Sequence, residues 1–135
     1  MAYFETDTGG RVYFEHHRAP GLPVVLIHGW GMSGDYWASA VEGLLAAGHG
    51  AIVIDQRGCG RSDRDFTDMS IAAIAGDVAA IIDRCDVPRV ALNGWSLGGA
   101  VAVAAAALLG NRVAGLILTC GASPRYVQGD GFPHG

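Results

Sequence analysis

The stretch VALNGWSLGGA, residues 90–100, decides the predicted fold because it joins two apolar runs through one tight turn. The first run, Val90 to Leu92, has the length and composition of a buried strand, and the run after the turn has those of a buried helix. The turn carries the pattern G-x-S-x-G, in which Gly94 and Gly98 leave room for Ser96 to stand clear. The stretch therefore predicts a strand, a sharp turn with an exposed serine hydroxyl, and a helix.

Three further apolar runs predict the neighbouring strands: Val24 to Ile27, Ala51 to Ile54, and Leu116 to Thr119. Segments with apolar residues at steps of three and four lie between these runs and predict helices. The predicted helices cover residues 37–45, ending near Gly48, residues 71–85, capped by Ser70, and residues 97–109, closed by Gly110.

An antiparallel hairpin is predicted at the start of the chain, where Tyr3 to Thr6 and Val12 to His16 flank Gly9-Gly10. Strand and helix alternate after it, which predicts a mostly parallel sheet flanked by helices, the doubly wound α/β class. We expect residues 1–135 to form a single domain. The Gly- and Pro-rich tail, residues 121–135, is expected to be a loop or a frayed end.

The composition argues against several classes of protein. The formal net charge is −4 and the arginines are scattered along the chain, so nucleic acid is not an expected partner. Residues 1–7 contain neither a basic segment nor an apolar core, and the most apolar stretch, Ala100 to Leu109, is too short to span a bilayer. We therefore expect a cytoplasmic protein without a membrane segment.

The three cysteines, Cys59, Cys85 and Cys120, are widely spaced and form no CxxC pair. Neither a disulfide framework nor a zinc site is expected from this spacing. We expect the cysteines to act as small, partly buried hydrophobic residues.

Two backbone amides are candidates for holding an oxyanion beside the serine. The helix after the turn directs its first N–H groups and a partial positive charge towards the serine, so the amide of Leu97 is one candidate donor. The second should come from HGWGMSG, residues 28–34, which we call the oxyanion loop, and the amide of Trp30 is the candidate there. His28 is expected to hydrogen-bond neighbouring backbone and organise this loop, not to act as the catalytic base.

Three motifs together resemble the α/β-hydrolase fold superfamily. They are His28-Gly29-Trp30-Gly31, the run DQRGCGRSD at residues 55–63, and GWSLGG at residues 94–99. Within the superfamily they look most like the cofactor-free esterases, the perhydrolases (non-haem haloperoxidases) and the carbon–carbon bond hydrolases. The resemblance covers essentially the whole chain and corresponds to the N-terminal part of the family's fold.

The resemblance implies roles for individual residues. Ser96 would be the nucleophile, and the amides of Trp30 and Leu97 would form the oxyanion hole, with no metal and no organic cofactor. The charged residues Asp55, Arg57 and Asp63 would brace loops near the site. A serine at the turn, where an aspartate would serve dehalogenases and epoxide hydrolases, favours ester-type acyl transfer.

The family's remaining triad members follow the serine in the order acid, then histidine. Here the segment after Leu116 to Thr119, Cys120-Gly121-Ala122, has no carboxylate, and the family's lid and last strands are missing. Asp130 and His134 are the candidates left for the acid and the base. A second interpretation makes the same residues a polar tail without a catalytic role.

The predicted function is a serine hydrolase that cleaves small carboxylic esters by two-step acyl transfer. Three alternatives stay open: a half-enzyme that needs a second chain for its acid and histidine, a catalytically silent binding module, and a perhydrolase. Trp30 and Trp95 flank the motifs, where an aromatic wall would favour short or aromatic acyl groups, whereas Trp37 is expected in the core.

The strand at residues 115–119 is predicted to be an exposed apolar edge of the sheet. Such edges pair readily with another chain. We therefore expect a homodimer, either through antiparallel pairing of two such edges or through an exchanged element.

Overall fold

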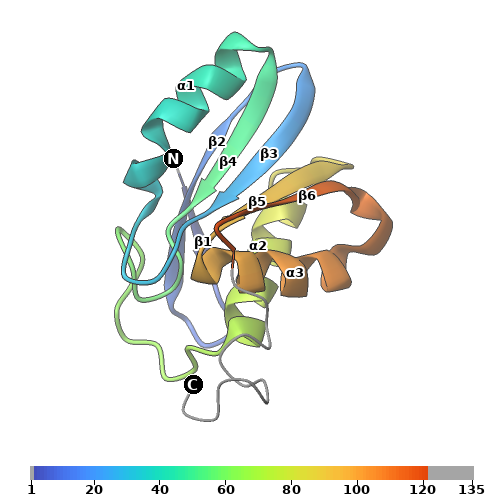
Figure 1. The fold of residues 1–135 in the computed structure, drawn as a ribbon. Helices are drawn as coiled ribbons and strands as arrows, with labels where there is room; N and C mark the ends of the chain where they lie inside the picture. Colours follow the sequence, from blue (N-terminus) through green and yellow to red (C-terminus); the bar gives the residue numbers. More distant parts are fainter. Residues whose placement is uncertain (1, 122–135) are drawn as a thin grey trace.

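Six strands form one mixed sheet in the computed structural model, which describes residues 2–121 (Figure 1). In chain order they are β1 (Ala2–Glu5), β2 (Arg11–His17), β3 (Gly21–Ile27), β4 (His49–Ile54), β5 (Val90–Trp95) and β6 (Val113–Thr119). Across the sheet the order is β1-β2-β4-β3-β5-β6. The β1–β2 and β2–β4 pairs are antiparallel, and the β4–β3, β3–β5 and β5–β6 pairs are parallel, so the predicted fold class is confirmed.

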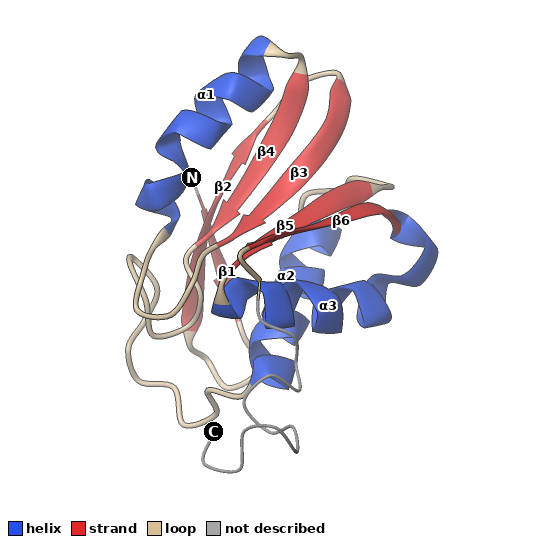
Figure 2. Cartoon of the chain, in the orientation of Figure 1, coloured by secondary structure: helices blue, strands red, loops and turns tan. Residues whose placement is uncertain are grey.

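Helices cover both faces of this sheet (Figure 2). They are α1 (Ala38–Ala46), α2 (Ile71–Arg84) and α3 (Leu97–Leu109), with 3-10 turns η1 (Gly34–Trp37) and η2 (Gly110–Arg112). Helix α1 lies on one face, and α2 and α3 lie together on the other. Helices on both faces explain why β3 and β4 contain unbroken apolar runs, since both sides of these strands are buried over Val24 to Ile27 and Ala51 to Ile54.

The core has two parts, one on each face of the sheet. Alternate residues of β3 divide between them: Val25 and Ile27 belong to the larger cluster beneath α2 and α3, and Val24 and Leu26 belong to the smaller cluster beneath α1. This follows from the alternation of side chains along a strand. Side chains therefore pack against β3 from both faces of the sheet, which fixes the position of this strand.

The predicted cap of α2 is confirmed, whereas several predicted ends differ: β4 begins before Ala51, β5 ends after Leu92 and β6 begins before Leu116. Ser70 accepts a hydrogen bond from the backbone N–H of Ala73 (3.1 Å), as predicted for the cap of α2. The hairpin is confirmed, but its turn covers residues 6–9, closed by a hydrogen bond from the N–H of Gly9 to the carbonyl oxygen of Thr6 (2.9 Å), so the predicted Gly9-Gly10 pair lies at its end. The helix predicted to begin at Trp37 begins at Ala38, because Trp37 closes the 3-10 turn η1 that Ser33 caps.

The cysteine prediction is correct for two of the three residues. All three are free; Cys85 is buried and Cys59 is half-buried. Cys120 is exposed, which corrects the prediction, because it follows the last strand of the described sheet.

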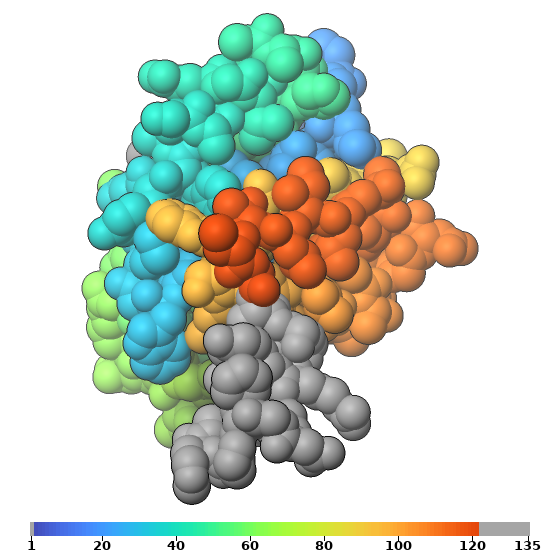
Figure 3. All heavy atoms as spheres, viewed as in Figure 1, coloured from blue at the N-terminus to red at the C-terminus, as the bar shows by residue number. Residues whose placement is uncertain are grey.

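Strand β6 forms the edge of the described sheet, with β5 as its neighbour there. Leu116, Ile117 and Leu118 are 42%, 48% and 45% exposed. The last described residues, in orange-red, contribute a broad part of the surface in Figure 3.

None of the helices within residues 2–121 has the length and apolar character needed to cross a membrane.

Candidate active site

Ser96 occupies the turn between β5 and α3, in a backbone conformation that is rare for a residue with a side chain. Its φ is +55° and its ψ is −120°. Such a conformation costs about 1–3 kcal/mol and persists when the surroundings determine it, which is common at functional sites. The observed strain therefore directs attention to the Ser96 side chain.

The two glycines of the motif are required by close backbone contacts. A Cβ at Gly94 would collide with the carbonyl group of Gly98, whose carbon would lie 2.5 Å away. A Cβ at Gly98 would collide with the carbonyl oxygen of Ile27 and would lie 2.5 Å from that of His28. The start of α3 thus lies directly against the end of β3, and no side chain fits between them.

Strand β6 holds the turn from the other side. The backbone N–H of Ser96 donates to the carbonyl oxygen of Thr119 (3.1 Å). The Thr119 hydroxyl donates to Oδ1 of Asn93 (2.9 Å). These bonds tie the serine turn and β5 to the edge strand β6.

The oxyanion loop runs next to this turn. A Cβ placed on Gly29 would lie 3.4 Å from the Cβ of Ser96 and 3.2 Å from the carbonyl oxygen of Trp95. Trp30 and Leu97, the candidate donors, are the residues that follow these neighbours in the chain. Within residues 2–121, neither of their backbone N–H groups has a hydrogen-bond acceptor. Among those described residues nothing occupies either amide, so both can bind an anionic oxygen, and that of Leu97 begins a helix.

His28 is buried and uses both ring nitrogens inside the protein. Its Nδ1 lies 2.8 Å from the carbonyl oxygen of Gly29, and its Nε2 accepts from the backbone N–H of Gln56 (3.0 Å). The Gln56 side chain returns a hydrogen bond to the His28 carbonyl oxygen (2.6 Å). Burial lowers the pKa of His28, which favours the neutral ring. His28 is therefore the loop organiser that the sequence predicts.

Asp55 joins the oxyanion loop to the DQRGCGRSD run. Its Oδ1 accepts from the backbone N–H of Gly34 (2.6 Å), and its Oδ2 accepts from that of Arg61 (2.8 Å). A Cβ at Gly60 would collide with the same carboxylate. Asp55 therefore has a bracing role, as the family resemblance implies.

Arg57 and Asp63 brace the same region through ion pairs. Arg57 donates twice to Asp77 on α2 (2.7 and 2.8 Å) and once to the carbonyl oxygen of Asp68 (2.9 Å), and Asp77 raises the pKa of Arg57. Arg11 donates its backbone N–H to Asp63 (2.9 Å) and lowers the pKa of that carboxyl group. The sequence analysis missed Asp77, which lies on the inner face of an amphipathic helix without a motif to mark it.

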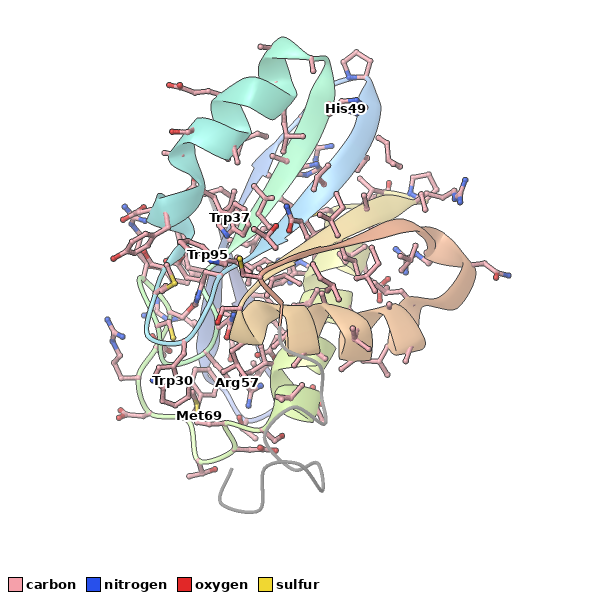
Figure 4. The ribbon with its side chains drawn as sticks, viewed as in Figure 1. Trp30, Trp37, His49, Arg57, Met69 and Trp95 are labelled. Atoms are coloured by element: carbon pink, nitrogen blue, oxygen red, sulfur yellow. The ribbon has the colours of Figure 1, made fainter. Side chains whose placement is uncertain are left out.

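The three tryptophans occupy different environments (Figure 4). Trp30 is 80% exposed, whereas Trp37 is buried, as predicted. Trp95 packs edge-to-face against Trp37 (ring centroids 5.9 Å apart) and against Tyr36 (6.1 Å). Trp95 therefore belongs to an aromatic cluster next to α1, and the sequence analysis did not identify Tyr36 as its partner.

The predicted base and acid, His134 and Asp130, lie outside the described residues. Both ring nitrogens of His28 have hydrogen-bond partners within the protein. His49 lies at the opposite end of the sheet from Trp95 (Figure 4). The described part of the chain contains no group of three His, Cys, Asp or Glu side chains arranged to hold a metal ion.

Comparisons with known proteins agree with this architecture. The family model for the alpha/beta hydrolase fold matches residues 23–133. The chain is 38% identical to a non-heme chloroperoxidase of Streptomyces lividans, over all of this chain and 50% of that protein. It is 42% identical to a pimeloyl-[acyl-carrier protein] methyl ester esterase of Methylococcus capsulatus, over 84% of this chain and 42% of that protein.

Solved structures give the same result. An esterase from Exiguobacterium antarcticum superposes with a TM-score of 0.88 at 32% identity, over 98% of this chain and 50% of that one. The chain thus spans about half the length of the relatives that it matches. On the family match and the shared architecture, the chain belongs to the α/β-hydrolase fold family.

Proposed function

We propose that this chain carries the nucleophile and the oxyanion hole of a serine hydrolase that cleaves carboxylic esters. The observation that carries the proposal is the position of Ser96, held at φ +55° between a strand and a helix, with obligatory glycines on either side. The esterases among its relatives support an ester substrate.

The proposed reaction proceeds by acyl transfer in two steps. A base removes the Ser96 proton while Oγ attacks the ester carbonyl carbon, and the amides of Trp30 and Leu97 stabilise the oxyanion. The C–O bond to the alcohol breaks, and the alcohol leaves with the proton from the base. Water then attacks the acyl-serine by the reverse proton route, which releases the carboxylic acid and restores the serine hydroxyl. His134 as base and Asp130 as acid are our proposal from their order in the chain.

The relationship to a non-heme chloroperoxidase favours perhydrolase activity as a second candidate. In that reaction hydrogen peroxide takes the place of water in the second step, and a peroxycarboxylic acid leaves. A peracid assay with acetate and peroxide separates this activity from simple ester hydrolysis.

A half-enzyme is the third candidate, because the histidine beside the serine turn in the described residues has both ring nitrogens engaged. In this case a second chain supplies the base.

We also propose a homodimer through β6, since Leu116, Ile117 and Leu118 leave apolar surface exposed at that edge. Light scattering that finds only monomers would contradict the homodimer.

The deciding experiment is p-nitrophenyl acetate turnover by the chain beside three variants. Ser96→Ala should lower turnover by about a thousandfold or more. His134→Ala should cause a similar loss if the tail supplies the base. The matched control is Ser39→Ala, at an exposed serine of α1, which should leave turnover unchanged.

Three outcomes of this assay decide between the candidates. Loss in Ser96→Ala alone would exclude His134 as the base and leave the nucleophile standing. No turnover by the parent chain, with restoration by a second chain that carries a histidine and an acid, would establish the half-enzyme. No turnover and no restoration would indicate a silent module.

A further inference from the structure

We propose that Trp95 is a positioning residue that holds the oxyanion loop in register with Ser96, through its edge-to-face contacts with Tyr36 and Trp37. The inference rests on the proposed function. It gives a role in the same site to the residue at the first x of the G-x-S-x-G pattern. Trp95 acts through the loop and not by contact with the reacting atoms.

The cluster joins the two segments that carry the candidate oxyanion donors. Tyr36 and Trp37 belong to η1, which follows the oxyanion loop directly, and Trp95 directly precedes Ser96. A shift of either segment relative to the other therefore has to separate the Trp95 ring from its two partners. Aromatic rings in edge-to-face contact resist such displacement because their attraction depends on their geometry.

Trp37 gives the cluster a fixed base. Its side chain is 7% exposed and packs with Leu26 and Val53 in the core beneath α1. Its buried Nε1 has no hydrogen-bond partner in the described structure, so packing alone holds this ring. Leaving a buried N–H without a hydrogen-bond partner is unfavourable. Because Trp37 is present despite this cost, we infer that the position requires the size and shape of its ring.

The oxyanion loop needs this support because its own composition makes it pliable. Glycines occupy positions 29, 31 and 34, and Gly31 has a φ of +67°. The start of the loop is held by His28, and its end is held by the bond from Gly34 to Asp55. Both of these bonds lead to the loop that follows β4, whereas the aromatic cluster leads to the serine turn itself.

A merely structural role for Trp95 makes a different prediction. A core residue would change the free energy of unfolding without changing the chemistry at Ser96. A positioning residue changes the rate of attack, because misplacing the donors relative to the oxyanion by about 1 Å costs up to about a hundredfold. The two roles are separated by measuring loop opening and serine reactivity in the same variants.

The experiment compares the full chain with Trp95→Leu, Trp95→Phe and Tyr3→Leu. Tyr3→Leu is the matched control, since Tyr3 forms an edge-to-face pair with Tyr13 (5.4 Å) in the N-terminal hairpin. The first readout is amide hydrogen exchange of residues 29–34, and the second is labelling of Ser96 by a fluorophosphonate, resolved into maximal rate and half-saturating concentration.

Trp95→Leu is expected to speed exchange of the loop by about threefold or more. It should lower the maximal labelling rate by about tenfold to a hundredfold, with little change in half-saturating concentration. Trp95→Phe should restore most of the rate, because the smaller ring keeps an edge-to-face contact. Tyr3→Leu should match the parent in both readouts.

Unchanged loop exchange in Trp95→Leu would overturn the inference, whatever the labelling shows. So would an equal labelling rate in Trp95→Leu and Tyr3→Leu. A parent chain that resists the probe, or a Ser96→Ala variant labelled like the parent, would overturn the proposed function alone, and loop exchange would then decide whether Trp95 couples the two segments.

Discussion

The serine turn and the β6 edge lie on adjacent strands and differ in almost every physical respect. The backbone around Ser96 is held by three kinds of contact: close backbone contacts, the hydrogen-bonded ring of His28, and the aromatic cluster of Trp95. At β6, three large apolar side chains are about half exposed and share no such network among residues 2–121, although Thr119 at the end of the strand bonds to the serine turn. The comparison teaches that the specific contacts of the described residues gather where β3 and β5 end, because neighbouring segments there restrict the backbone on both sides.

The largest expected effect tests the bracing around the central strands. Asp77→Ala leaves Arg57 buried without its carboxylate, and we expect the free energy of unfolding to fall by about 3–5 kcal/mol. Urea denaturation measures the change. Asp83→Ala is the matched control on the same helix, because its pair with Arg112 is exposed, and it should cost less than about 1 kcal/mol. Equal losses in both variants would remove the distinction between braced centre and surface.

A smaller effect on the free energy of unfolding is expected when the pH is lowered, through protonation of His28. Because burial lowers its pKa in the folded state, the unfolded state binds its proton more readily. Stability from this residue is present above the ordinary histidine pKa of 6.5 and is lost as the pH falls from there through the folded pKa. His28→Asn should therefore flatten the decline of unfolding free energy below pH 6.5.

His16 contributes in the same direction, since burial and Arg18 lower its pKa too. His16→Asn consequently serves as the comparison, and it should remove only its own part of the pH dependence. A parent chain whose stability is constant between pH 7 and pH 5 would contradict both assignments.

The smallest effect is expected at the edge. Leu116 is the register partner of Leu92, but Leu92 is fully buried, whereas Leu116 is 42% exposed. We expect Leu92→Ala to cost about 2–5 kcal/mol and Leu116→Ala less than about 1 kcal/mol in the monomer, by urea denaturation at low protein concentration. A cost at Leu116 as large as that at Leu92 would mean that β6 is as tightly packed as β5.

Much of the fold is predictable from the sequence because local rules suffice for it. Apolar runs such as Val24 to Ile27 and the stripe on α2 report burial directly, and Ser70 marks a helix start. The prediction failed at Trp37, where a 3-10 turn comes before the helix, since the apolar spacing does not distinguish the two kinds of turn.

The candidate site is predictable to the same extent. Ser96, Trp30 and Leu97 stand in motifs whose spacing has a mechanical reason, so they can be proposed without a structure. Asp77 and Tyr36 could not be identified, because each acquires its role from a residue far away in the chain: Arg57 for Asp77, and Trp95 for Tyr36.

The sequence by itself determined the succession of strands and helices along the chain and the place of the serine between two glycines. These features depend on residues close together in the chain, where side-chain periodicity and steric freedom act directly. Only the tertiary structure decided that Arg57 pairs with Asp77 and that Trp95 packs on Tyr36 and Trp37. These contacts join distant segments, and their existence depends on strand order and register, which local patterns do not specify.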